Sequence, residues 1–63
     1  MRREFWVVRP EYEELGLRVR VFDEAVRIER VDERGNVLFS IDIGMDEVLL
    51  LATRLKQALK ELL

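Results

Sequence analysis

Arginines alternate with apolar residues along one stretch of this chain, and they are its strongest candidates for chemistry. Arg18 and Arg20 precede a charged dipeptide, and Arg27 follows it. A guanidinium group donates several hydrogen bonds in one plane, which suits phosphate oxygens. Phe22 shares the face of the arginines in the expected strand, and Trp6 joins them if its own strand turns that side outward. Because aromatic rings stack on exposed bases, these residues predict a binding surface for single-stranded nucleic acid.

A second interpretation of the same residues remains open. The three arginines, together with Glu29, also suit cross-strand ion pairs on an ordinary solvated sheet face, where each pair contributes little stability. Trp6 and Phe22 equally suit the core or an interface between subunits. The residues alone do not choose between these interpretations.

The chain contains few side chains that could act in catalysis. Histidine and cysteine are both absent, and they are the commonest acid–base and nucleophilic groups. Ser40 is the only serine, and its expected neighbours Arg27 and Asp42 offer no candidate base. The acidic pairs fall at expected turns or at a helix start, where they satisfy the backbone: Asp23-Glu24, Asp32-Glu33 and Asp46-Glu47. The sequence therefore predicts a protein that is not an enzyme, with no catalytic residues, no cofactor and no metal site.

The candidate binding residues depend on a β-hairpin predicted for residues 17–31. Two alternating apolar and polar runs flank Asp23-Glu24 there, which is typical of two strands joined by a tight turn. Folding about this dipeptide predicts four opposed pairs: Val21 with Val26, Val19 with Ile28, Arg20 with Arg27, and Arg18 with Glu29. The apolar pairs then share one face of the hairpin, and the charged pairs share the other.

Two further strands extend the hairpin into a sheet. Residues 5–9 are β-prone and apolar on both faces, and Pro10 ends this strand because proline cannot donate to a ladder. Residues 32–36 form a turn, and residues 37–43 alternate again. The expected register pairs Val31 with Asn36 and Ile28 with Phe39, and it places Arg27 beside Ser40. Short links of this kind predict a four-stranded antiparallel meander.

The apolar pattern changes to a helical period after Gly44. Asp46 is the expected N-cap, and the helix is expected to run from Glu47 to Leu62. One face of this helix carries an apolar stripe: Val48, Leu51, Ala52, Leu55, Leu59 and Leu62. We expect the stripe to pack on the apolar face of the sheet. The fold class is therefore α+β, with residues 1–63 forming a single domain of four strands and one C-terminal amphipathic helix.

Self-association is the expected source of additional stability. A chain of 63 residues buries only about 60% of the surface of its unfolded form, and without cysteine it has no disulfide. Leu49 and Leu50 lie outside the helical stripe, and Phe5 and Val7 lie on a strand that is apolar on both sides. Although single exposed leucines are common, these four residues are the predicted interface of a homodimer.

Charge and composition narrow the functional class. The net charge is −2, which counts against generic nucleic-acid binding, since that usually shows as a basic excess. Arginine outnumbers lysine and side-chain amides are rare, a composition similar to that of thermophile proteins. No apolar run approaches the length of a membrane span, and the first residues do not show the pattern of a signal peptide. We therefore expect a soluble, cytoplasmic protein.

The order of the elements resembles the positive cofactor four family of transcriptional coactivators. The resemblance lies in the strand at residues 5–7, the alternating run at 17–22, the strand and acidic-glycine turn at 25–35, and the capped helix that starts at 46–47. It implies a homodimer joined through helices and strands, whose sheets bind single-stranded DNA, in preference to RNA, in transcription or genome maintenance. By position, the three arginines would contact the DNA backbone, and Trp6 or Phe22 would stack on bases.

Other classes of function fit the same sequence. The chain also suits a protein-interaction or oligomerisation module whose ligand docks on Leu49 and Leu50 or on a free strand edge. A designed scaffold with no biological ligand is a further alternative, because the patterning is regular.

Nucleic-acid binding through arginines would depend steeply on salt concentration, since bound phosphates release counterions.

Overall fold

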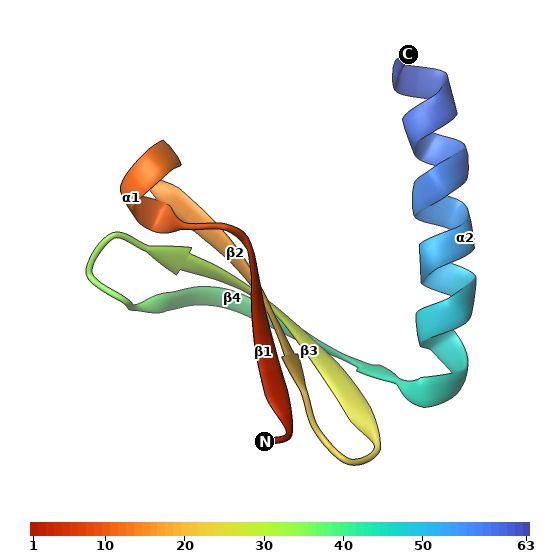
Figure 1. Cartoon of the computed structure of the whole chain (residues 1–63), viewed down its shortest axis with the longest axis horizontal. Helices are drawn as coiled ribbons and strands as arrows, with labels where there is room; N and C mark the ends of the chain where they lie inside the picture. The colour runs from red at the N-terminus through yellow and green to blue at the C-terminus, as the bar shows by residue number, and fades with distance from the viewer.

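A computed structural model describes the backbone of residues 1–63 and every side chain except those at positions 12 and 13. Four antiparallel strands form one sheet in the order β1-β2-β3-β4, and a long helix follows at the C-terminus (Figure 1). The elements are β1 (Arg3–Val8), α1 (Pro10–Glu13), β2 (Leu15–Val21), β3 (Ala25–Asp32), β4 (Val37–Gly44) and α2 (Met45–Leu62). The predicted α+β fold, a meander followed by one long helix, is confirmed. The short helix α1 was not predicted, and it begins at a proline, whose fixed φ suits the first helical position.

The central hairpin has the predicted register. All four expected pairs are present: Val21 with Val26, Val19 with Ile28, Arg20 with Arg27, and Arg18 with Glu29. The turn is tight, and the backbone N–H of Phe22 donates to the carbonyl of Ala25 at 2.8 Å. Since side chains alternate across a strand, the charged pairs occupy one face of the sheet and the apolar pairs the other.

The register of β4 differs from the prediction by two residues. The structure pairs Ile28 with Ile41 and Arg27 with Asp42, where the prediction had Phe39 and Ser40. The β3–β4 turn closes one residue later than expected, with Val31 opposite Val37, and a bulge next to Arg30 takes up one more residue. A shift of two residues preserves the faces of a strand, so Ile41 still lies on the apolar face.

An aspartate organises the turn between β3 and β4. One carboxylate oxygen of Asp32 accepts hydrogen bonds from the backbone N–H groups of Arg34 at 2.9 Å and Asn36 at 2.8 Å. These bonds, chiefly those from Asn36, hold the pKa of Asp32 below its usual value. Gly35 supplies the positive φ of 88° that the turn requires.

The helix α2 begins one residue before the predicted N-cap. Gly44 is the N-cap and has an extended conformation. The backbone N–H of Gly44 donates a hydrogen bond to the Glu47 carboxylate at 3.3 Å. Asp46 therefore lies in the first turn, where its charge still complements the helix dipole.

The sequence predicted that the helix packs on the apolar face of the sheet, and this prediction is wrong. It rises away from the strands (Figure 1), and none of its residues, all of which the structure describes, is buried. The reason is the junction: β4 ends at Gly44 and α2 starts at Met45, so no loop is available to turn the helix back over the sheet. Neither helix of the described chain is long and apolar enough to cross a membrane.

The packing within one chain is accordingly open. Among the described side chains, Val31 and Ile43 are the buried apolar residues, at 1% and 9% exposure. The radius of gyration is 12.8 Å, whereas a compact domain of this length has about 11 Å. The sheet is therefore held mainly by its ladders and turns, with little core beneath it.

The hydrogen bonds of Asp32 predict the effect of removing its carboxylate from the turn. Replacement D32A removes the acceptor of two backbone N–H groups and should lower Tm by about 5 °C, the effect of roughly one hydrogen bond in a domain of this size. The variant E33A is the control, because Glu33 is exposed in the same turn. Thermal unfolding followed by circular dichroism measures both. Equal Tm values for the two variants would contradict the assigned role of Asp32.

Candidate nucleic-acid interface

One face of the sheet carries all five residues predicted to bind nucleic acid. The strand register arranges them in two rows across the sheet. The first row is Glu4, Arg20, Arg27 and Asp42, and the second is Trp6, Arg18, Glu29 and Ser40. Phe22 follows at the end of β2. The pairing of Trp6 with Arg18 settles which way β1 turns: its tryptophan lies on the arginine face and Phe5 on the opposite one.

A buried carboxylate lies at the centre of this face. The side chain of Glu29 is only 3% exposed, and its Oε1 lies 2.7 Å from Arg18 Nε and 3.5 Å from Arg20 Nε. Burying an unpaired carboxylate is very unfavourable, so Glu29 needs the two guanidinium groups around it. The arginines in turn are held in fixed orientations. Arg20 also contacts Glu4 Oε2 at 3.5 Å.

A second ion pair lies at the edge formed by β4. Arg27 donates from Nε to Asp42 Oδ1 at 2.7 Å and from Nη2 to Oδ2 at 3.4 Å, a forked arrangement that fixes the guanidinium plane. The hydrogen bond and charge of Arg27 lower the pKa of Asp42, and Asp42 raises the pKa of Arg27. Both side chains remain substantially exposed.

Two of these arginines lie over aromatic rings. The Cζ atom of Arg18 is 5.1 Å from the ring centre of Trp6, and that of Arg27 is 4.9 Å from the ring centre of Phe22. Both distances suit cation–π attraction. Both aromatic residues are half-buried, so part of each ring remains accessible.

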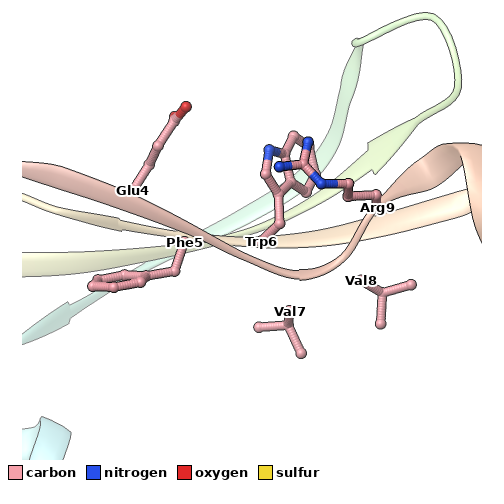
Figure 2. A pocket seen from close by; sticks show the side chains of 6 residues that line it. All are labelled: Glu4, Phe5, Trp6, Val7, Val8 and Arg9. Atoms are coloured by element: carbon pink, nitrogen blue, oxygen red, sulfur yellow. The ribbon is translucent and has the colours of Figure 1, made fainter.

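Arg9 belongs to the site although the sequence did not indicate it. Its Cζ lies 5.8 Å from the ring centre of Trp6. Figure 2 shows Glu4, Trp6 and Arg9 on one side of β1, with Phe5, Val7 and Val8 on the other. Residues 6 and 9 share a side because a bulge falls between Trp6 and Val8. Strict alternation would place them on opposite sides, so no pattern in the sequence could have identified Arg9.

Gly16 makes room for Trp6. A Cβ atom at position 16 would lie 2.7 Å from Pro10 Cδ and 3.0 Å from Trp6 Cζ3. The indole ring therefore packs directly against the glycine backbone of β2. Only a residue without a side chain leaves the ring in this position.

The charges of this face nearly balance, with four arginines and three carboxylates: Arg9, Arg18, Arg20, Arg27, Glu4, Glu29 and Asp42. Arg18, Arg20 and Arg27 are each within 4.0 Å of a carboxylate, drawn from Glu4, Glu29 and Asp42. The face is consequently zwitterionic rather than strongly basic. It offers oriented donors and aromatic surface. Among the described residues, no cluster of three or more potential metal ligands occurs.

The four predicted dimer residues are exposed and lie on two elements of the chain, two on β1 and two on α2. Phe5 and Val7 are 46% and 59% exposed on β1, and Leu49 and Leu50 are 73% and 66% exposed on α2. Leu49 borders a groove at the β2–β3 turn, and Leu50 borders another beside β4. Other exposed apolar residues were not assigned to the interface from the sequence: Phe39, Ile41, Leu55, Leu59 and Leu62.

The Arg27–Asp42 pair predicts a specific change in titration. In R27A the pKa of Asp42 should rise towards its ordinary value, while the pKa of Asp32 stays low, because its partners are in the turn. A lowered folded-state pKa stabilises the protein above the unfolded value of about 3.9 and loses this effect as pH falls through the folded pKa. R27A should therefore lose less stability on acidification. Carboxyl NMR titration measures both groups, and an unchanged Asp42 would contradict the pairing.

The contact beneath Trp6 predicts a fluorescence change. In G16A the new methyl group should displace the indole, shift its emission and lower Tm. Trp6 is the only tryptophan, so the signal has one source. The control is G44A, where a Cβ would meet only the flexible Glu47 carboxylate at 3.6 Å. A G16A spectrum identical to that of the unmodified protein would show that the ring does not pack on Gly16.

No protein-family model, curated protein or solved structure matches this chain. The resemblance to the positive cofactor four family therefore stays an expectation from the sequence.

Proposed function

We propose that this protein binds single-stranded nucleic acid, DNA in preference to RNA, on the arginine face of the sheet. The observation that carries the proposal is the pair of guanidinium–aromatic contacts on that face, Arg18 with Trp6 and Arg27 with Phe22. An open sheet with donors beside rings offers phosphate contacts and base stacking at neighbouring positions.

The carboxylates on this face orient the arginine side chains, and this effect outweighs their repulsion of a phosphate. Among the described side chains, the hydrogen bonds of Arg18 and Arg20 run through Nε. Their terminal Nη atoms are the groups left to donate to a phosphate. Arginines held by a carboxylate on one side lose less side-chain entropy when a ligand binds on the other.

The ion pairs change the expected salt dependence. Contacts from three arginines to a single strand give a slope of about −2 for log K against log salt concentration. Nearby Glu29 and Asp42 reduce the attraction of the face for phosphates further. Stacking on Trp6 and Phe22 must then provide much of the affinity, and the salt dependence should be shallower than arginines alone would give.

A titration with a labelled single-stranded oligonucleotide tests the proposal. F22A should weaken binding by about 1–3 kcal/mol through lost stacking. The double variant R20A/R27A should weaken binding and flatten the salt slope by at most about 1.4. The variant R34A is the control, because it removes a charge from the β3–β4 turn. Arg18 is left intact, since its loss would strand the buried Glu29.

Two outcomes of this titration would contradict the proposal. The first is that micromolar protein does not bind the single-stranded oligonucleotide at low salt. A duplex that contains the same strand is titrated in parallel as a control. The second is an affinity that R20A/R27A and F22A leave unchanged, which would place any binding elsewhere on the molecule. Fluorescence anisotropy measures all arms.

A second candidate function is an oligomerisation module. It is favoured by one observation, the large apolar surface that a single chain leaves uncovered on both the sheet and α2. In this role the arginine face is an ordinary solvated surface, and the apolar surface mediates self-association. The two functions are compatible, because they use opposite faces of the sheet.

A further inference from the structure

The chain exposes more surface than a folded monomer of its size. Its solvent-accessible surface is 5448 Å², whereas a monomeric protein of 7.5 kDa exposes about 4,200 Å². The excess of about 1,200 Å² exceeds the roughly 800 Å² that each partner buries in a standard interface and falls in the range of permanent dimers. The inference below rests on the oligomerisation role and specifies its partner and geometry.

The sheet contributes one half of this surface. Its apolar face carries a row that crosses all four strands: Phe5, Val19, Ile28 and Ile41. Phe39 lies on the same face, one row further along β4. Phe5 on β1 is 46% exposed, and Ile41 and Phe39 on β4 are 48% and 63% exposed. The apolar face is therefore uncovered at the two edge strands.

The helix contributes the other half. Two grooves flank its base on the apolar side of the sheet. One is lined by Val21, Val26, Val48 and Ala52 among others, and the second by Ile41, Ile43, Leu50 and Leu51 among others. Beyond this base the same helical stripe continues through Leu55, Leu59 and Leu62, which are 58%, 54% and 84% exposed. The first half of the stripe thus contacts its own sheet, and the second half is uncovered.

These two uncovered surfaces cannot meet within one chain. The direct junction of β4 and α2 directs the helix away from the strands (Figure 1). Two sheets cannot stack flat on each other either, because α2 stands out from the apolar side of each one. A helix is about 10 Å across, which is the usual spacing between layers that pack on a sheet face. The element that fits over the sheet is therefore a helix from another molecule.

We propose that a second copy of this chain covers the apolar face by reciprocal exchange of helices. The second half of α2, through Leu55, Leu59 and Leu62, lies on the partner's outer strands at Phe39 and Ile41, and the partner's helix does the same in return. Such a twofold interface is closed, because each copy supplies both complementary surfaces and leaves neither uncovered. Both arginine faces remain outward, so the assembly is independent of nucleic-acid binding.

Disulfide trapping tests this geometry. The chain has no cysteine, so introduced cysteines report unambiguously. Mixing L59C with F39C under mild oxidation should give a covalent heterodimer faster than either variant alone gives a homodimer. K60C replaces L59C in the control, because Lys60 belongs to the polar side of α2, and it should not cross-link with F39C. Efficient L59C homodimers, or F39C homodimers, without the mixed product would overturn the exchanged arrangement.

Sedimentation distinguishes failure of the proposed helix exchange from failure of the oligomerisation role. The unmodified protein should sediment at twice the 7.5 kDa chain mass. L59E should raise the dimer dissociation constant at least about tenfold, because it places a charge in an apolar contact, and K60E should leave it unchanged. A monomer at all concentrations would overturn both the inference and the oligomerisation role. A dimer without the mixed disulfide would overturn the inference alone.

Discussion

The junction at Gly44 determines where the apolar surface of this protein ends up. β4 passes into α2 without a connecting residue, so the helix continues outward from the sheet edge instead of folding back across it. The strands and the helix each have an apolar side, yet only the first turns of α2 reach the sheet. Hydrophobic burial is the main favourable term in folding. Little of that burial occurs within one chain, where Val31 and Ile43 are the buried apolar residues among the described side chains.

The opposite face of the sheet depends on a different interaction. Glu29 is buried under Arg18 and Arg20, and its negative charge fixes both guanidinium groups. The forked contact of Arg27 with Asp42 has the same effect at the sheet edge. Neither the buried pair nor the exposed pair is expected to add much net stability, but both hold donors in position. The arginines of this face are therefore held in place by its carboxylates, and its aromatic rings lie beside them.

Local patterns predicted the parts of the site that lie on one hairpin. The pairing of Arg20 with Arg27 and of Arg18 with Glu29 follows from alternation about a tight turn, and the structure has both pairs. Features that depend on an extra residue were not visible. The later β3–β4 turn and the bulge next to Arg30 together moved β4 by two positions and gave Arg27 its carboxylate partner. The bulge in β1 brought Arg9 to Trp6.

The sequence alone determined the strands, the helix, the hairpin register and the two faces of the sheet, because periods of two and of 3.6 residues are local properties of the backbone. Tertiary structure decided the orientation of β1, since a strand that is apolar on both sides has no preferred face in its pattern. It also decided the direction of α2, because the path of a chain past Gly44 depends on the length of the connection and not on the amphipathicity of the helix. The same apolar stripe that the pattern assigns to a core is, in the folded chain, largely a surface.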